Sequence, residues 1–274
     1  MLRGAGLTSK GAWALLKTVA AYLREWGRDL RAAWAFLTIL PPRLDAPPAW
    51  PRMTRALPIV GAVIGLIQAV ALIALLAAGL PVMAAALLGV LSGVVISGAM
   101  HEDGLADVAD ALGGANRERR LEIMRDAASG AFGVLALIFA IGAQTAALSG
   151  LAQRGAWTLL TALPVAHLLS RAAMVLVMRR LKPARADGLG HAAGRPPAAL
   201  TWRILSGAAL ITIAAFAACC GGPRPALWAL AAAGLAAWGM TRLAGRLFGG
   251  HTGDVLGATE VGVRGVVLLA LAAA

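Results

Sequence analysis

Four carboxylates and a histidine lie within residues 101–110, whose sequence is HEDGLADVAD, although the whole chain has only 13 acids. Asp103, Asp107 and Asp110 follow one another at spacings of four and three, so a helix would present all three on one face. Like charges at these spacings repel. Because oxygen ligands suit hard divalent cations, the pattern predicts a Mg²⁺ site, with Mn²⁺ as the alternative ion.

A metal ion at this position can bridge a pyrophosphate, neutralise a leaving group and orient an attacking hydroxyl. Glu102 is predicted as a further ligand, and His101 as a ligand or a base. The predicted catalytic residues are therefore His101, Asp103, Asp107 and Asp110. Two other interpretations remain open: an exposed helix start where the helix dipole favours acids, and a purely structural metal site.

The composition places the chain in a membrane. Hydrophobic residues make up 59% of the 274 residues and charged residues only 14%, whereas soluble domains carry about 25% charged residues. The net charge of +12 comes from arginines in loops between apolar runs. This placement indicates loops that touch anionic lipid, and it argues against a nucleic-acid-binding face.

Seven apolar runs of about 20 residues predict an all-α polytopic bundle of seven transmembrane helices, since that length crosses the hydrocarbon of a bilayer. The runs are 57–79, 81–100, 131–150, 157–178, 203–221, 226–247 and 255–274. The segment 31–41 is apolar but short, and we expect it to be re-entrant or interfacial. Before it, large apolar residues recur every three to four positions, which predicts an amphipathic helix in the headgroup region, with a weakly ordered extension as the alternative. The predicted domains are residues 1–29, an N-terminal extension, and residues 30–274, the membrane domain.

The loops differ in charge on the two sides of the predicted bundle. The segments 1–56, 101–130 and 179–203 are long and basic, whereas the other connections are short and nearly uncharged. The positive-inside rule places the basic segments in the cytoplasm, and so predicts a protein of the bacterial inner membrane. The acidic run and the stretches 179–196 and 249–260 would then all face the cytoplasm. This one-sided arrangement is typical of an enzyme more than of a transporter, which carries ionisable residues near the membrane midplane.

The acidic run closely resembles that of the cobalamin synthase family, the adenosylcobinamide-GDP ribazoletransferases or cobalamin-5′-phosphate synthases. Further segments are similar to that family, and the resemblance extends from about residue 30 to the C-terminus. These segments are PIVG at 58–61, Ser170-Arg171, LEIMRD at 121–126 with Gly130 and Gly133, ARADGLG at 184–190, and GDVLGA at 253–258.

The resemblance implies a Mg²⁺-dependent step late in vitamin B12 assembly. Adenosylcobinamide-GDP would be joined to α-ribazole or its 5′-phosphate when a ribose hydroxyl attacks the cobinamide-linked phosphorus and GMP leaves. It also implies that Glu102, Asp103, Asp107 and Asp110 hold the metal. The substrate-binding residues that it implies are Arg125, Asp126, Arg171, Arg185, Asp187, His191 and Asp254.

Some residues leave alternatives or depart from the family pattern. An acid paired with Arg171 is the alternative to a substrate contact, and Glu260 and Arg264, four apart, are expected to pair along a helix. Residues 127–130 are Ala-Ala-Ser-Gly where a Ser-Arg-Ile-Gly type of sequence is expected. His191 stands where Lys is commoner, and these two departures leave the exact phosphate contacts open.

Two competing functions are a CDP-alcohol phosphatidyltransferase-like enzyme and a transporter. The first also uses a DG-bearing aspartate cluster, but its pattern has Ala-Arg after the DG pair, whereas Asp107 follows Ala106 here. The sequence does not decide between nucleoside and nucleotide, the lower-ligand base, the general base, the role of residues 1–29 or how the corrinoid docks. Membrane lipid is an expected partner, and both a homo-oligomer and association with other enzymes of B12 synthesis are compatible with the sequence.

Overall fold

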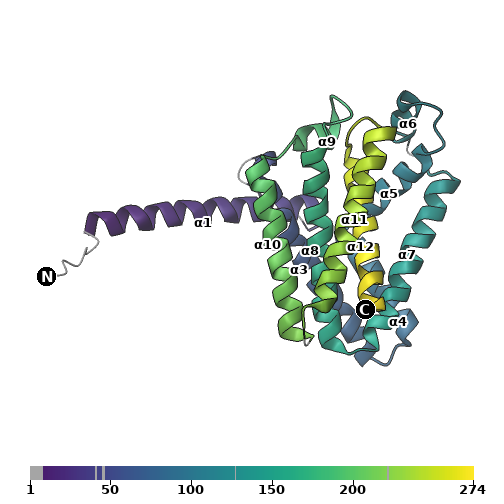
Figure 1. The fold of residues 1–274 in the computed structure, drawn as a ribbon, viewed down its shortest axis with the longest axis horizontal. Coiled ribbons are helices and arrows are strands. Elements are labelled where there is room, and N and C mark those ends of the chain that lie inside the picture. Colours follow the sequence, from purple (N-terminus) through teal and green to yellow (C-terminus); the bar gives the residue numbers. More distant parts are fainter. Residues whose placement is uncertain (1–8, 41, 45–46, 127, 221) are drawn as a thin grey trace.

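The computed structural model describes residues 9–274 except residues 41, 45–46, 127 and 221, and within them it has helices and no named strand. The all-α class is therefore confirmed (Figure 1). The elements are α1 Ser9–Leu37, α2 Trp50–Met53, the 3-10 helix η1 Thr54–Ala56, α3 Leu57–Ala77, α4 Val82–Ser97, α5 Met100–Ala111, α6 Arg117–Ile123, α7 Ala131–Ala152, α8 Ala156–Arg180, α9 Gly188–Ala193, α10 Ala198–Cys219, α11 Arg224–Leu247 and α12 Gly253–Ala273.

Within the described residues, six helices are long and apolar enough to cross a membrane, so the protein is an integral membrane protein. They are α3 with the short helices before it, α7, α8, α10, α11 and α12. The predicted run 81–100 corresponds to α4, whose 16 residues are about 24 Å long. After α4 the chain bends by 94° into α5. Gly98 and Ala99 take left-handed backbone conformations at this bend, which glycine adopts without steric cost. The described residues therefore give six spans, or seven if the bent pair of α4 and α5 counts as one.

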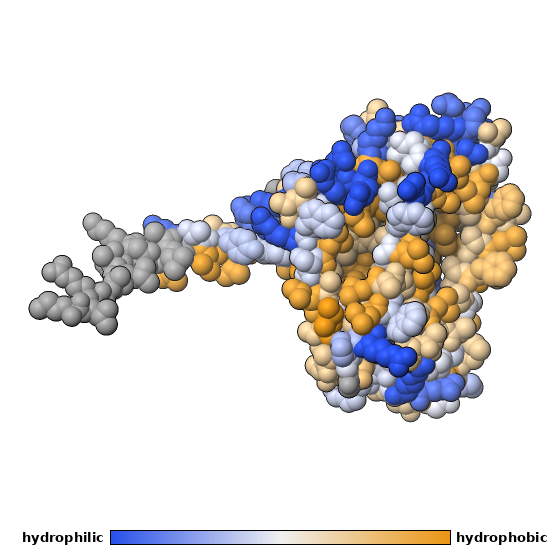
Figure 2. Space-filling model, in the orientation of Figure 1, coloured by the Kyte–Doolittle hydropathy of each residue, from blue (hydrophilic) through white to orange (hydrophobic). Residues whose placement is uncertain are grey.

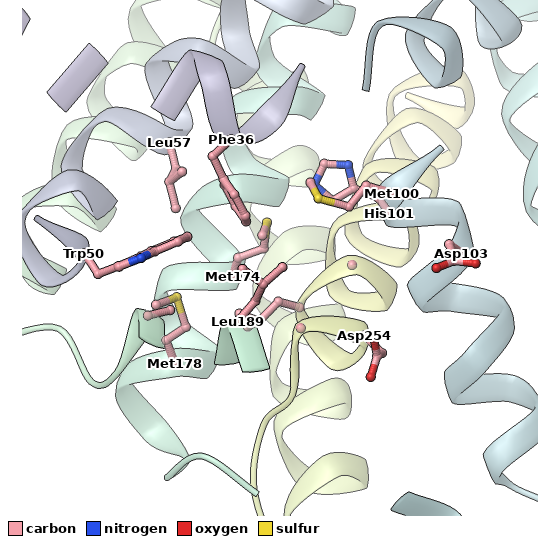
Figure 3. Close-up of a pocket in the computed structure, with 14 residues that line it drawn as sticks. Phe36, Trp50, Leu57, Met100, His101, Asp103, Met174, Met178, Leu189 and Asp254 are labelled. Carbon is pink, nitrogen blue, oxygen red and sulfur yellow. The ribbon is translucent and has the colours of Figure 1, made fainter. Parts of the chain in front are cut away.

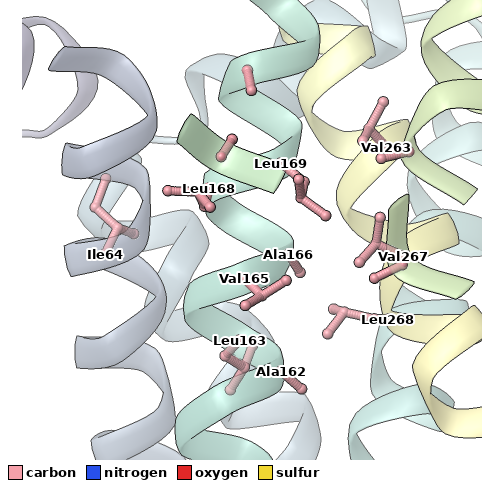
Figure 4. Packing of buried hydrophobic residues seen from close by; sticks show 14 of the residues in the cluster. Ile64, Ala162, Leu163, Val165, Ala166, Leu168, Leu169, Val263, Val267 and Leu268 are labelled. Atoms are coloured by element: carbon pink, nitrogen blue, oxygen red, sulfur yellow. The ribbon is translucent and has the colours of Figure 1, made fainter. Parts of the chain in front are cut away.

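Helices α8 and α12 lie at the centre of the bundle. Their most apolar windows are 83% and 67% buried, against 22–39% for the other spans. Figure 4 shows buried side chains of α8 between Ile64 of α3 and Val263 and Val267 of α12. Gly61 and Gly65 let α3 approach α8 closely, because a Cβ at Gly65 would lie 2.5 Å from the carbonyl oxygen of Leu163.

Helix α1 is continuous from Ser9 to Leu37, so residues 31–37 extend the helix before them and are not the re-entrant segment that was one of the two expectations for 31–41. No glycine or proline interrupts the chain between residues 28 and 37. Only the C-terminal part of α1 packs on the bundle, where Asp29 accepts a hydrogen bond from Arg55 at 2.8 Å, and the rest extends away from it (Figure 1). Large apolar residues on the extended part are exposed, including Trp13 and Leu23. The interfacial position of this helix stays a prediction.

Three loop regions that are far apart in sequence meet at one end of the bundle. Arg117, at the start of α6, donates from Nε to the carbonyl of Phe248 at 2.8 Å. Arg185 donates to the carbonyl of Leu121 at 2.8 Å. The backbone of His251 pairs with the strand-like segment at Pro183. Figure 2 shows hydrophilic residues gathered at the end that carries α6 and α9, above an apolar belt, with a smaller hydrophilic group at the opposite end.

Candidate active site

The acidic face of α5 is positioned by close packing across the first turn of α12. A Cβ at Gly104 would lie 2.8 Å from the backbone oxygen of Asp254, so only glycine allows this approach. Asp103 and Asp107 flank Gly104 on α5 and are thereby brought to the side of Asp254. Thr252 caps α12: its Oγ1 accepts a hydrogen bond from the backbone of Val255 at 3.2 Å and donates to Asp254 at 3.1 Å.

The acids at this junction outnumber the cations that face them. Partial burial, together with the carboxylates of Asp103, Asp254 and Asp110, raises the pKa of Asp107 to about 7. Arg185 opposes this rise, and its Nη1 lies 3.7 Å from Asp254. The excess of negative charge is what a bound cation offsets.

The acids at the junction would hold Mg²⁺ together with a substrate and water, and not by themselves. Within the described part of the chain, no three or more His, Cys, Asp or Glu side chains are arranged to enclose a metal ion. Mg²⁺ commonly keeps several waters and is bound by one or two carboxylates together with substrate phosphates. Asp103, Asp107 and Asp254 would supply one or two carboxylates to such an ion, and water and a substrate phosphate would supply its other ligands.

Asp110 makes contacts with another helix that the sequence did not predict. Its two carboxylate oxygens accept hydrogen bonds from the backbone N–H groups of Gly130, at 2.7 Å, and Gly133, at 2.8 Å. These groups belong to the first turn of α7, where free N–H groups attract an anion. A Cβ at Gly130 would lie 2.6 Å from Asp110 Oδ1, so glycine allows this close approach. Asp110 thus fixes α5 to α7, and its role as a metal ligand stays a prediction.

Glu102, predicted as a further metal ligand, pairs with an arginine inside the bundle. It is 5% exposed, and its Oε1 accepts a hydrogen bond from Arg264 at 2.7 Å. Arg264 lies 3.7 Å from Glu260, so the expected pairing along α12 is confirmed. The sequence predicts that the whole stretch 249–260 lies on the polar face. Glu260, at the end of that stretch, is instead fully buried among helices.

Arg171 is buried inside the bundle and lines neither of the cavities described below. It pairs with Glu260, and its Nη1 lies 2.8 Å from Nδ1 of His167. His167 in turn lies 2.7 Å from the side-chain oxygen of Gln68. The alternative that Arg171 is paired with an acid is therefore what the structure shows, in place of a direct substrate contact.

A polar cavity of about 210 Å³ lies beside Asp254 at the polar end. Its ionisable lining residues are Arg185, Asp187, His191, His251 and Asp254. Asp187 is held by Arg125 at 2.8 Å, and both side chains are more than half exposed. Asp126 is exposed outside this cavity and accepts a hydrogen bond from the backbone of Ala128.

His251 is a site residue that the sequence interpretation missed. It is 1% exposed, and neither ring nitrogen has a hydrogen-bond partner among the described residues. Burial lowers its pKa to about 4, so the ring is neutral at pH 7. The signal was its place in the sequence Gly-Gly-His-Thr-Gly-Asp, three residues before Asp254.

An apolar cavity of about 170 Å³ lies on the other side of Asp254. Figure 3 shows apolar side chains on one side of this cavity and Asp103 and Asp254 on the other. The apolar side chains labelled there are Phe36, Trp50, Leu57, Met100, Met174, Met178 and Leu189. His101 also lines it and is 1% exposed; neither ring nitrogen has a hydrogen-bond partner among the described residues, and Nδ1 lies 4.0 Å from Glu260 Oε2. Asp254 is therefore shared by a polar and an apolar cavity.

Comparison with known proteins assigns this arrangement to a family. A family model described as cobalamin-5-phosphate synthase matches residues 29–272. The chain belongs to the cobalamin-5-phosphate synthase family. The match covers the bundle, both cavities and the C-terminal part of α1, which contributes Phe36.

Curated relatives of this cobalamin-5-phosphate synthase family member are named adenosylcobinamide-GDP ribazoletransferase. The protein of Azorhizobium caulinodans is 47% identical over 217 residues, which cover 78% of this chain and 81% of that protein. The protein of Xanthobacter autotrophicus is 44% identical over 85% of this chain and 91% of that protein. The protein of Bradyrhizobium diazoefficiens is 42% identical over 89% of this chain and 93% of that protein. No solved structure matches the chain.

The candidates in this cobalamin-5-phosphate synthase family member thus fall into groups. Those at the two cavities are His101, Asp103, Arg185, Asp187, His191 and Asp254, with Asp107 beside Asp103 and Arg125 holding Asp187. Those turned toward other partners are Glu102, Asp110 and Arg171.

Proposed function

We propose that this protein is an adenosylcobinamide-GDP ribazoletransferase, which joins adenosylcobinamide-GDP to α-ribazole or its 5′-phosphate and releases GMP in vitamin B12 synthesis. The observation that carries the proposal is that Asp103, Asp107 and Asp254 meet beside a polar cavity. The family of the chain is described as cobalamin-5-phosphate synthase, and its curated relatives are named adenosylcobinamide-GDP ribazoletransferase. Three acids facing Arg185 form a surface for a metal-bound diphosphate.

The reaction that we propose is a phosphoryl-group substitution. A ribose hydroxyl of the acceptor forms a new bond to the phosphorus attached to cobinamide, and the bond from that phosphorus to the bridging oxygen breaks. GMP leaves with that oxygen, and the hydroxyl proton passes to a base. Mg²⁺ held by Asp103, Asp107 and Asp254 would supply charge neutralisation for the diphosphate.

The described side chains contribute binding, orientation and proton acceptance. Arg185 is fixed by the carbonyl of Leu121 at 2.8 Å, so its guanidinium is held at the polar cavity, where it can contact a phosphate. His251 and His101 line the polar and apolar cavities, respectively, and have ring nitrogens without partners among the described residues. They are our candidates for the base, because an imidazole nitrogen that has no other partner is free to accept the proton.

We also propose that the end carrying α6 and α9 faces the cytoplasm of a bacterial inner membrane. Support comes from the arginines in the loops at this end, which the positive-inside rule places in the cytoplasm. The exposed apolar row of α1 would then lie in the headgroup region and contact membrane lipid. In a background with Cys219 and Cys220 changed to serine, a cysteine introduced at exposed Arg119 should react in inside-out vesicles and not in intact spheroplasts. The reverse pattern contradicts this orientation.

The activity is tested with purified protein in detergent, adenosylcobinamide-GDP and either α-ribazole or its 5′-phosphate. We expect GMP to form only with both substrates and Mg²⁺ present, and EDTA to stop it. GMP formation that persists undiminished in EDTA contradicts the proposed requirement for Mg²⁺. CMP release from CDP-diacylglycerol and an alcohol, without GMP from the first pair, contradicts the proposed function and favours the phosphatidyltransferase alternative.

A further inference from the structure

The apolar cavity beside Asp254 has no role in the chemistry described so far. It lies among α1, α2, α3, α5, α8, α9 and α12, and its lining combines a wall of apolar side chains with two carboxylates at one side (Figure 3). We infer that this cavity binds the heteroaromatic base of the nucleoside acceptor, with the ribose directed toward Asp254. The inference rests on the proposed function and adds to it the place of one substrate.

The wall of the cavity suits a flat aromatic ring. The rings of Phe36 and Trp50 meet edge to face, with their centroids 4.9 Å apart, and leave ring surface for a further aromatic group. Met174 and Met178 lie opposite on α8, at 3% and 1% exposure. Methionine sulfur is polarizable and makes favourable contacts with aromatic rings. The cavity volume of about 170 Å³ exceeds the roughly 150 Å³ of a cavity known to admit benzene.

The polar groups in the cavity argue for a heterocycle over a lipid chain. His101 is buried, lines the cavity and has no hydrogen-bond partner for either ring nitrogen among the described residues. A base with a ring nitrogen can satisfy one of these atoms, whereas an acyl chain leaves both unpaired. By contrast, the open hollow between α4 and α7, around Leu87 and Ile138, has no ionisable residue among its lining and is suited to lipid.

The position of the cavity places the two substrates against each other. Asp254 borders both the apolar and the polar cavity. A base in the apolar cavity puts its ribose at the Asp103–Asp254 side, and so aims a ribose hydroxyl at a diphosphate in the polar cavity. Guanine fits the apolar cavity poorly, because its several donors and acceptors would be desolvated against apolar side chains.

A change in substrate preference tests the inference. Ala193 lines the cavity from α9 and is 3% exposed, so Ala193→Leu fills part of it. We expect the kcat/KM ratio of benzimidazole riboside over imidazole riboside to fall at least about tenfold, since the larger base loses its room. Met178→Ala should move that ratio in the opposite direction. Ala146→Leu, the same change in the lipid-suited hollow, should leave it unchanged.

Binding separates this inference from the proposed function. We expect the benzimidazole riboside to bind wild type in equilibrium dialysis, about tenfold more weakly to Ala193→Leu, and equally to Ala146→Leu. Unchanged binding and preference in Ala193→Leu overturn the inference even if wild type releases GMP. If Ala193→Leu raises the KM for adenosylcobinamide-GDP and leaves the KM for the nucleoside unaltered, the inference is also overturned, and the cavity belongs to the other substrate. Absence of GMP from wild type, with cavity-dependent nucleoside binding intact, overturns the proposed function alone.

Discussion

Two charged regions of this protein lie next to each other and differ in their balance of charge. Inside the bundle, Glu102 and Glu260 face Arg171 and Arg264. At the polar end, Asp103, Asp107 and Asp254 face only Arg185 among the groups that affect the pKa of Asp107. The first region is electrically matched, as charges buried among membrane helices must be. The second retains an excess of negative charge that a metal and a substrate can use.

Adjacent residues of one helix separate the two regions. Glu102 and Asp103 are consecutive on α5, but successive helical side chains point about 100° apart. Glu102 therefore turns toward Arg264 inside the bundle, and Asp103 turns toward the cavity beside Asp254. A matched acid stabilises the bundle, whereas an unmatched acid beside a cavity is a candidate for chemistry.

The largest expected effect tests the unmatched region. Asp103→Asn should lower GMP formation by more than about 100-fold, because a metal-binding carboxylate is lost, while thermal stability is retained since repulsion with Asp107 is relieved. GMP release in detergent and a thermal melt measure both. The variant Glu102→Gln changes the neighbouring residue in the same way and serves as the control. It should lower stability much more than activity. Wild-type turnover in Asp103→Asn removes this residue from the metal site.

The next effect tests the matched region. Glu260→Gln leaves Arg171 and Arg264 buried without their shared carboxylate, and should lower the free energy of unfolding by about 3–5 kcal/mol. Denaturant unfolding in detergent, followed by helical circular dichroism, measures it. Adding Arg171→Met to this variant should recover part of the loss, because Arg171 then has no carboxylate partner, whereas Arg264 keeps Glu102. A loss of less than about 1 kcal/mol would show that the network does not hold α8 to α12.

Asp110 sharpens the comparison of the two regions. The sequence predicts it as a metal ligand, whereas in the structure it accepts hydrogen bonds from the start of α7. Asp110→Ala removes both hydrogen bonds to the start of α7 and should cost about 1–2 kcal/mol of stability. GMP formation per folded protein should fall less than in Asp103→Asn. If activity falls as far as in Asp103→Asn with stability unchanged, the metal role predicted from the sequence is right.

The smallest effect concerns pH. The folded-state pKa of Asp107, about 7, is above its ordinary value of 3.8, so the folded protein holds a proton that the unfolded chain releases. Asp107 should therefore contribute stability to the metal-free protein that is lost as the pH rises from about 4 to about 7, whereas His251, with its lowered pKa, contributes in the opposite direction. The difference between melts of the wild type and of Asp107→Asn in EDTA isolates the contribution of Asp107. Mg²⁺ should reduce this difference, and an equal pH dependence of the two proteins in EDTA contradicts the raised pKa.

The lengths of the hydrophobic runs were enough to determine the bundle. Stretches of about 20 apolar residues predicted the spans because they match bilayer thickness, and the described helices agree with them within several residues. The spacing of the acids on α5 and the pairing of Glu260 with Arg264 also followed from sequence, since neighbours within one helix are fixed by its 3.6-residue period.

Tertiary structure alone decided which acid serves which partner. Glu102 meets Arg264 on α12, Asp110 meets the start of α7, and Arg171 meets Glu260, and each of these partners lies on another helix. The burial of His251 and the apolar cavity depend likewise on how loops and helices pack. Sequence spacing fixes the face of one helix, but contacts between helices depend on their crossing and rotation, which no local pattern encodes.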